Sequence, residues 1–412
     1  MKFEAAENSL EGVGDDGSAV SIPFTEILAL TSNVILTIPE GSESSLRVYS
    51  YKALDVTDEI KKYYLNELPP YLDPRSANVT VINSANAGAR TGEAVYTSLL
   101  RPLFKELGVV HEYILTESKS SIQSFAGSLV PESGPHTIVI LSGDTSIHEL
   151  INSLRPISEA TDLTILPIPT GSGNALMTSL DLGSPTSAMF SMLHGSVRPL
   201  RPFYGSFPPG SKEVIPPTDD EPDGLTRIFA LVVVSWAIHA ALVGDSDSPE
   251  YRKLGNDRFK IAAKENLERG AAWHGKLSYV SSSGGKLEPV ELEDLEHSYV
   301  LTTSISSLEP GFKIAPTAKP LSGSLELVRL PFSSGEEIMR VLMLAYQDGA
   351  HVGEPGVLYT EIESLRVEMG DSEERMRRWC VDGRIVIVPL GATVEVHSGV
   401  ENVRGWNVYI VA

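Results

Sequence analysis

The strongest constraint on the fold is a regular alternation of strand-like and helix-like patterns between residues 78 and 200. Short apolar runs are separated by longer stretches with helical periodicity. Parallel strands need a crossover connection of a dozen or more residues, and a helix usually supplies it. Strands are expected at 78–83, 111–116, 136–141 and 163–167, and helices at 93–107, 120–129, 147–154 and 175–180. The sequence therefore predicts an α/β domain with a parallel sheet over residues 76–203.

The regions on either side of this domain have a different sequence pattern. Residues 1–75 begin with an acidic, glycine-rich stretch, interpreted as a tail, which precedes accessory strands at 27–30, 34–38 and 46–51 and a helical piece at 58–68. After a proline- and aspartate-rich loop, residues 204–412 show mostly short strands with turn signals, which predict a mainly antiparallel β-rich domain. Helical stretches at 251–269 and 335–348 interrupt it.

The longest apolar run of the chain, Ile228–Val243, contains the polar residues Ser235 and His239. It is too short for a comfortable membrane span and is interpreted as buried strand. The single cysteine, Cys380, excludes an intrachain disulfide and favours a reduced compartment, so we expect a cytoplasmic protein. A formal net charge of −21 argues against nucleic acid as a partner, because phosphate backbones need a basic surface.

Three loops at the carboxyl ends of the predicted parallel strands are rich in glycine, serine, asparagine and aspartate: 82–92, 142–149 and 169–175. Ligands of open parallel sheets bind at this edge. Small residues let backbone amides approach a phosphate, and the helix that follows adds partial positive charge. One such loop alone is more typical of a tight βα turn, but three together at one sheet edge predict a phosphate-binding site. The P-loop pattern G-x-x-x-x-G-K-[ST] is absent from the chain.

Two of these loops carry a family resemblance. SGDTSIHE (142–149) followed by LPIPTGSGNAL (166–176) resembles the paired motifs of the diacylglycerol kinase catalytic domain family, and is most similar to its sphingosine kinase branch. Residues 235–259, FKIAP (312–316) and VDG (381–383) are similar to later signatures of that branch. The resemblance covers about residues 78–410, and the first strands are similar to PH-like accessory strands. It implies a nucleotide-binding α/β domain of the NAD kinase/diacylglycerol kinase type, a lipid-binding β-rich domain, and an active cleft between them.

The resemblance implies an ATP- and Mg²⁺-dependent lipid kinase that phosphorylates the primary hydroxyl of a sphingoid base, with peripheral membrane contact where it meets its lipid. Two alternatives stay open. One is a degenerate relative that binds nucleotide or lipid without turnover, and the other is a diacylglycerol or ceramide kinase. A hydrolase is disfavoured, because the chain has neither a G-x-S-x-G elbow nor an H-E-x-x-H helix.

Phosphoryl transfer needs a base that receives the proton of the acceptor hydroxyl. The resemblance makes Asp144 that base, whereas from its position alone it could equally cap the helix expected near Ile147. Glu149 is expected to orient Mg²⁺ or the nucleotide, or to act as in a capping box. Asp245 matches the carboxylate that pairs with the amino group of the lipid in sphingosine kinases, and its alternative is a solvated loop residue.

The nucleotide-contacting positions implied by the resemblance are Asn83, Thr116, Ser142, Gly143, Thr145, Glu149, Gly171, Ser172, Gly173, Asn174, Arg252, Arg258 and Asp382. Asn174 is equally expected as a helix N-cap, and Asp382 with Gly383 as a hairpin turn. Arg252 and Arg258 match arginines that face the phosphates, and the break expected at Gly255–Asp257 lets Arg258 begin a second helix.

The sequence also departs from the family pattern. Thr145 stands where the motif usually has glycine, and a left-handed backbone there would strain a β-branched residue. Ala85, Val243 and Arg384 replace an arginine and two acidic residues of the branch. These departures leave the predicted fold intact and leave catalytic competence and lipid identity open.

Overall fold

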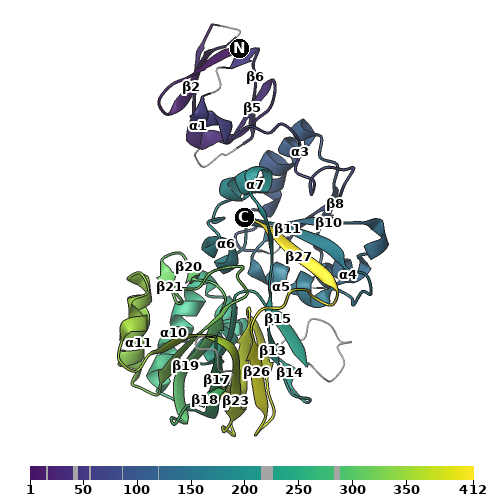
Figure 1. Cartoon of the computed structure of the whole chain (residues 1–412). Coiled ribbons are helices and arrows are strands. Elements are labelled where there is room, and N and C mark those ends of the chain that lie inside the picture. The colour runs from purple at the N-terminus through teal and green to yellow at the C-terminus, as the bar shows by residue number, and fades with distance from the viewer. Residues whose placement is uncertain are drawn as a thin grey trace.

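The computed structural model describes residues 1–14, 17–39, 45–54, 57–85, 87–118, 120–214, 226–282 and 288–412. Figure 1 shows three parts arranged in a row: a small N-terminal β module, an α/β domain in the middle and a larger β-rich domain. Much of the proline- and aspartate-rich loop predicted after residue 204 lies outside the described residues.

The N-terminal module contains two small sheets. Strands β1 (Lys2–Ala5), β2 (Ser9–Val13), β3 (Ala19–Pro23) and β7 (Ala53–Leu54) form one, and β4 (Ile27–Leu30), β5 (Val34–Thr37) and β6 (Arg47–Ser50) form the other. The three predicted strands are confirmed. The predicted tail is wrong, because its described part contains strands β1, β2 and β3, whose inward side chains, including Phe3, Leu10 and Ile22, share a core. The predicted helix at 58–68 is only the single turn α1 (Asp58–Lys61), and the PH-like assignment stays a prediction.

The α/β domain contains a six-stranded sheet in the order β12-β27-β11-β10-β8-β9. Its strands are β8 (Asn78–Asn83), β9 (Glu112–Leu115), β10 (His136–Ser142), β11 (Thr161–Pro169), β12 (Val197–Pro199) and β27 (Trp406–Val411). All are parallel to their neighbours except β12. Every residue of β10 is buried, because helices cover both faces of the sheet. The predicted parallel sheet is confirmed.

The helices of this domain follow the strands as expected. They are α2 (Gly92–Val95), a π-helical turn (Tyr96–Leu100), α3 (Arg101–Leu107), α4 (Ser121–Ser128), α5 (Asp144–Ser153), α6 (Ala175–Ser179) and α7 (Pro185–His194). Helix α5 begins three residues before the predicted start at Ile147, so that Asp144 itself is its first residue.

The C-terminal strand β27 returns to the α/β domain and pairs in parallel with β11, from Trp406 opposite Thr161 to Ile410 opposite Ile165. Figure 1 shows this last strand inside the middle domain. The predicted division at residue 204 therefore does not hold for residues 406–411, and for the rest of the chain it stays a prediction. The pairing partner of an apolar strand is set by tertiary contacts, which the local pattern does not contain.

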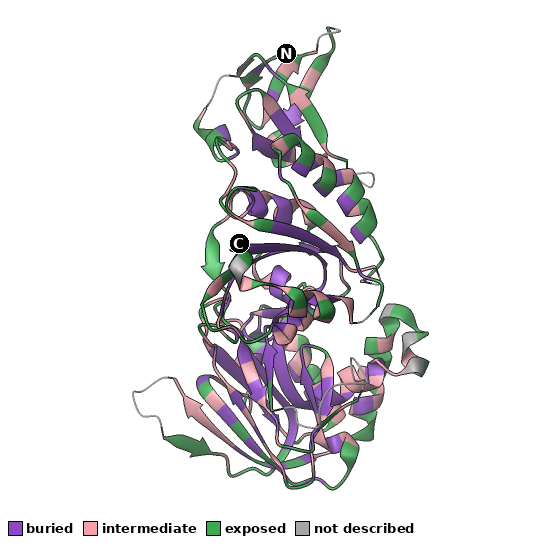
Figure 2. Ribbon diagram, turned by 90° about the vertical axis from the view of Figure 1, so that its right-hand side faces the viewer, coloured by how far each residue is buried: buried purple, intermediate pink, exposed green. Residues whose placement is uncertain are grey.

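The β-rich domain is a large, mainly antiparallel sheet of twelve strands. The strands that form it are β13 (Phe203–Ser206), β14 (Lys212–Glu213), β15 (Arg227–Ala230), β16 (Val233–Ala237), β17 (Trp273–Ser281), β18 (Pro289–Glu291), β19 (Glu296–Thr303), β22 (Leu325–Pro331), β23 (Leu358–Met369), β24 (Arg378–Val381), β25 (Arg384–Ile387) and β26 (Thr393–His397). Strands β20 (Ser307–Glu309) and β21 (Phe312–Lys313) form a separate pair. Figure 2 shows the buried residues concentrated in the strands of the two large sheets.

Helices α8 (Ile238–Ser246), α9 (Pro249–Arg252), α10 (Arg258–Arg269) and α11 (Gly335–Met343) pack against this domain. The interpretation of Ile228–Val243 as strand is wrong for its second half, which belongs to α8. The residues of Ile228–Val243 are buried or half-buried both in strand β16 and in helix α8, so the apolar pattern did not distinguish strand from helix. The expected break at Gly255–Asp257 is confirmed, since a 3-10 turn separates α9 from α10. Within the described residues, no helix is both long and apolar enough to cross a membrane.

Candidate active site

The three polar loops meet at the carboxyl edge of the parallel sheet. The Thr170 amide donates to the Ser142 carbonyl and the Asp144 amide donates to the Gly173 carbonyl, each over 3.1 Å. A Cβ atom on Gly171 would lie 2.4 Å from Gly143 Cα, and one on Gly88 would lie 2.5 Å from the Thr170 carbonyl oxygen. These glycines are therefore required by backbone-to-backbone packing of the loops. The predicted convergence of the loops is confirmed.

Gly173 differs from its neighbours in this cluster. A Cβ atom added to it would meet no atom within 4 Å, and Gly173 and Ser172 are both exposed. The family resemblance implied nucleotide contacts for both Gly171 and Gly173. The structure separates them, because Gly171 serves the loop contact and Gly173 borders open space.

Asp144 is the first residue of α5, but its carboxylate caps α6. Asp144 Oδ2 accepts from the Ala175 amide over 2.5 Å, and Oδ1 accepts from the Leu176 amide over 3.3 Å. Burial raises the pKa of Asp144 to about 7, against the effect of the Ala175 hydrogen bond, and the negative charge of Asp382 raises it further. A carboxyl group with a pKa near the working pH is suited to accept a proton from a hydroxyl.

Asn174 does not cap α6 with its side chain, so that alternative is wrong. Its amide nitrogen Nδ2 donates to the Gly171 carbonyl over 2.8 Å and braces the loop, while its Oδ1 is buried without a hydrogen-bond partner in the described chain. Ser142 also points inward, with its hydroxyl 2.6 Å from that of Ser146.

Asn83 and Thr116 support the first loop from inside the domain. Asn83 Nδ2 donates to Glu93 Oε2 over 3.0 Å and to the Tyr113 hydroxyl over 2.9 Å. Thr116 Oγ1 accepts from the Ala85 amide over 3.1 Å. Both side chains are buried, and neither lies on the cleft described next.

A cleft of about 500 Å³ lies between the loop cluster and the β-rich domain. The predicted site residues on its wall are Asp144, Thr145, Glu149, Ser172, Gly173, Arg258 and Asp382. Other parts of the wall are apolar, with Val232, Val243, Phe259, Leu308 and Ile385. The cleft thus joins a polar end, built from the loop cluster and the α5 N-terminus, to an apolar lining.

Asp382 lies in the predicted hairpin turn, between β24 and β25, with φ values of +48° for Asp382 and +94° for Gly383. Its carboxylate accepts hydrogen bonds from three successive backbone amides, those of Leu231, Val232 and Val233, over 2.7, 3.0 and 2.7 Å. Asp382 Oδ2 also lies 3.2 Å from His148 Nδ1. The turn is confirmed, and its carboxylate fixes the β15–β16 turn against α5.

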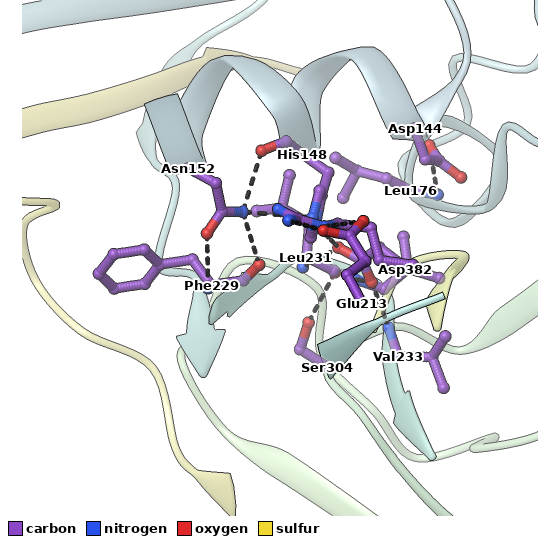
Figure 3. Close-up of polar contacts among 12 residues, drawn as sticks. Asp144, His148, Asn152, Leu176, Glu213, Phe229, Leu231, Val233, Ser304 and Asp382 are labelled. Carbon is purple, nitrogen blue, oxygen red and sulfur yellow. Dashed lines mark hydrogen bonds and ion pairs between the residues drawn. The ribbon is translucent and has the colours of Figure 1, made fainter. Parts of the chain in front are cut away.

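A second residue of α5 also contacts the β-rich domain. Asn152 exchanges two hydrogen bonds of 2.9 Å with the backbone of Phe229, one as donor and one as acceptor. Figure 3 shows His148 and Asn152 pointing from α5 toward Asp382 and Phe229. The helix that carries Asp144 is therefore fastened to the β-rich domain through buried polar contacts.

Two arginines reach the cleft from the β-rich domain. Arg258 begins α10, with Nη1 3.7 Å from Asp247 Oδ1. Arg384 donates from Nε and Nη2 to Glu213 over 3.0 and 2.6 Å. The sequence analysis missed Glu213, which is 171 residues from Arg384 and offers no local signal. The side chain of Arg252 lies outside the described part of the chain.

Asp245 is not part of the cleft wall. Its carboxylate receives hydrogen bonds from Arg375 over 2.8 Å, Arg378 over 2.9 Å and Asn266 over 3.1 Å. Burial alone would raise the pKa of Asp245, but these hydrogen bonds and the arginine charges hold it below its usual value. Asp247, two residues further on, does line the cleft.

Thr145 is the second residue of α5 and is exposed on the cleft. It is not among the described residues with a left-handed backbone. The strain expected for a threonine with a left-handed backbone at this position is therefore absent.

A Mg²⁺ ion is implied by the family resemblance. The described residues contain no group of three His, Cys, Asp or Glu side chains arranged for a metal. Mg²⁺ in phosphoryl-transfer sites is usually held by one or two carboxylates together with substrate phosphates and water. Glu149, which lines the cleft, fits that mode, whereas the oxygens of Asp144 and Asp382 already accept hydrogen bonds from backbone amides.

Comparisons with known proteins agree with this arrangement. Residues 78–203 match the family described as diacylglycerol kinase catalytic domain. The chain is 23% identical to sphingosine kinase 1 of Arabidopsis thaliana over 357 residues, covering 76% of this chain and 69% of the relative. It is 24% identical to sphingosine kinase 1 of Homo sapiens over 353 residues, covering 76% and 87%.

A similar fold occurs in a crystal structure assigned as a diacylglycerol kinase of Bacillus anthracis str. Sterne. The TM-score is 0.53 at 15% identity, with 81% of this chain and 94% of that chain covered, and this likeness concerns the fold alone. The chain is thus similar to the diacylglycerol kinase catalytic domain family over residues 78–203 and to sphingosine kinases over about three quarters of its length.

Proposed function

We propose that the protein is an ATP-dependent kinase that phosphorylates the primary hydroxyl of a sphingoid base such as sphinganine. The observation that carries the proposal is Asp144, whose buried carboxyl has its pKa raised to about 7 on a cleft with a glycine-lined polar end and an apolar lining. Lipid-kinase chemistry is supported by the comparisons, and the sphingoid base is our own assignment.

Asp144 acts as the general base in this proposal. The ionised carboxylate is held in place by the Ala175 and Leu176 amides and accepts the hydroxyl proton as the acceptor oxygen attacks. The nucleotide supplies the phosphoryl group. Accepting the proton turns a buried anion into a neutral group, which the buried setting favours.

The nucleotide phosphates are assigned to the polar end of the cleft. Ser172 and Gly173 border open space there, Thr145 offers a hydroxyl, and the N-terminus of the ten-residue helix α5 adds partial positive charge. Arg258 supplies a full positive charge. Asn83, Thr116, Ser142, Gly143, Gly171 and Asn174 shape the loops from within in this proposal, and Arg252 is assigned to the phosphates on the family resemblance alone.

The lipid is assigned to the apolar lining, where Val243, Phe259 and Ile385 accommodate a hydrocarbon chain. Among the described residues of the cleft, carboxylates outnumber arginines: Asp144, Glu149, Glu213, Asp247 and Asp382 against Arg258 and Arg384. A cationic head group suits such a cleft better than the neutral head of diacylglycerol or ceramide. We assign the ammonium group of the lipid to Asp247 rather than to Asp245, because Asp247 lines the cleft and Asp245 does not.

The degenerate-kinase alternative gains no support from Thr145, whose backbone is helical.

A lipid panel tests the substrate assignment directly. Purified protein, labelled ATP and vesicles containing sphinganine, ceramide or diacylglycerol should yield labelled product with sphinganine. Product from diacylglycerol alone would overturn the substrate assignment, and ATP binding without product from any of the lipids would favour the degenerate kinase.

A further inference from the structure

Ser235 and His239, the two polar residues of the apolar run Ile228–Val243, contact each other at the cleft wall. Ser235 belongs to β16 and His239 to the first turn of α8. Ala237 between them has a positive φ of +68°, where the chain turns from strand to helix. The Ser235 hydroxyl lies 2.7 Å from His239 Nδ1. The proposed function gives neither residue a role, although His239 lines the cleft.

The two edges of the His239 ring have different surroundings. Nδ1 is engaged by Ser235, and the ring stands edge-to-face against Tyr299 with the ring centroids 6.0 Å apart, so its orientation is fixed. Nε2 on the opposite edge has no hydrogen-bond partner within the described residues, and it is not enclosed by the protein. Because His239 lines the cleft, Nε2 is presented to the molecule that occupies the cleft.

The cleft wall beside this nitrogen is apolar. Val243 lies one turn further along α8, and it packs in one cluster with Cys380 and Ile385, which also line the cleft. A polar atom that loses its water and gains no partner costs free energy. A bare hydrocarbon chain would remove water from Nε2 and leave it unpaired, whereas a chain that carries a hydroxyl group at this position would replace that water.

The state of the imidazole suits a hydroxyl group. Burial lowers the pKa of His239 to about 4, so the ring is neutral at pH 7 and does not repel the ammonium group of a long-chain base. Nδ1 either accepts a hydrogen bond from Ser235 or donates one to it, and Nε2 is then a donor or an acceptor, respectively. A hydroxyl group both donates and accepts, so it pairs with either tautomer.

We propose that His239 is a specificity-determining residue whose Nε2 hydrogen-bonds a secondary hydroxyl group of the long-chain base, with Ser235 as the positioning residue that holds the imidazole. The inference rests on the proposed function, since it names a further contact to the same lipid. His239, Val243 and Asp247 recur at intervals of four residues and therefore lie on the same face of α8. A lipid whose ammonium group is bound at Asp247 has His239 on the same wall.

Matched lipids test this contact. The kcat/KM would be measured in detergent micelles for sphinganine, for 2-aminooctadecan-1-ol, which lacks the 3-hydroxyl group, and for 4-hydroxysphinganine, which has one hydroxyl group more. We expect the parent to prefer the base with the additional hydroxyl group about 3- to 10-fold in at least one of the two pairs, as a neutral hydrogen bond allows. The pair that shows the preference identifies the carbon atom that His239 reads.

Matched variants assign the preference to His239. His239→Leu should abolish it, and Ser235→Ala should weaken it. His239→Gln, whose amide reaches the level of Nε2, should retain part of the preference, whereas His239→Asn, which reaches only the level of Nδ1, should lose it. His397→Leu is the control, because His397 lies on β26 beside Glu395 and does not line the cleft. It should keep the preference of the parent.

A purely structural role for His239 is the competing explanation. It predicts that His239→Leu lowers the thermal midpoint and reduces kcat/KM equally for all three bases. That result would overturn the inference and leave the proposed function intact, as would a parent that shows no preference in either pair.

Binding of the same bases, measured by calorimetry, separates the inference from the kinase activity. A parent that binds them with the preference that depends on His239, but transfers no phosphate, supports the inference and contradicts the proposed function. A parent that neither binds nor phosphorylates any of the bases contradicts both.

Discussion

Asp144 connects two helices, since it begins α5 and accepts hydrogen bonds from the first amides of α6. The sequence offered a choice between catalytic base and cap of the nearby helix, and the structure shows a cap of a different helix. That outcome was not predictable, because the Ala175 amide is 31 residues away in the chain. The position of Asp144 directly after a buried strand was predictable from the local pattern alone.

The pair Asp245 and Asp247 gives a matched test at the residue scale. Asp247→Asn should raise the KM for sphinganine about tenfold and leave the KM for ATP unchanged, because it removes the proposed partner of the ammonium group on the cleft. Asp245→Asn should instead lower the free energy of unfolding by about 1–3 kcal/mol, because it leaves Arg375 and Arg378 without their carboxylate. Steady-state kinetics and denaturant unfolding measure both.

An Asp245→Asn variant that is fully stable but selectively impaired for sphinganine would return the lipid contact to Asp245. Unchanged kinetics in Asp247→Asn would remove Asp247 from the lipid site.

At the scale of elements, the alternation of strands and helices was sufficient to predict the parallel sheet and the convergence of its loops. The carboxyl ends of parallel strands lie at the same edge of the sheet whatever the strand order, so the loop cluster could be predicted from the local pattern. The division of Ile228–Val243 between strand β16 and helix α8 could not be predicted, because a buried apolar run suits either element. The chain changes from strand β16 to helix α8 at Ala237, whose φ is +68°. An alanine gives no sequence signal for a positive φ.

The glycines of the TGSGN loop give a matched test of how this element works. Gly171→Ala would place its Cβ 2.4 Å from Gly143 Cα, so we expect the loops to separate and the protein to lose about 1–3 kcal/mol of stability. Gly173→Ala meets open space and should leave the thermal midpoint nearly unchanged while weakening ATP binding at the proposed phosphate site. Differential scanning calorimetry and ATP titration check the pair, and equal stability losses in both variants would contradict the assignment.

At the scale of the whole molecule, α5 joins the two domains. His148 and Asn152 contact the β-rich domain, and Arg404 donates to the Asn152 and Leu154 carbonyls at the other end of the helix, over 2.9 and 2.8 Å. The last strand β27 then closes the α/β sheet beside β11. These links, like the Arg384–Glu213 pair, join residues about 75 to 250 positions apart, so a single sequence did not reveal them.

The pH dependence of sphinganine phosphorylation tests the central claim, that Asp144 is the general base of a lipid kinase. Burial raises the pKa of Asp144 to about 7, and only the ionised carboxylate accepts a proton. We expect kcat/KM to rise about tenfold per pH unit below pH 7 and to level off above it. Folded Asp144→Asn, which cannot ionise, should be about 10²- to 10⁴-fold slower and should lack this rise. A variant that keeps the parent rate, or that retains the same pH profile as the parent, would show that Asp144 is not the general base.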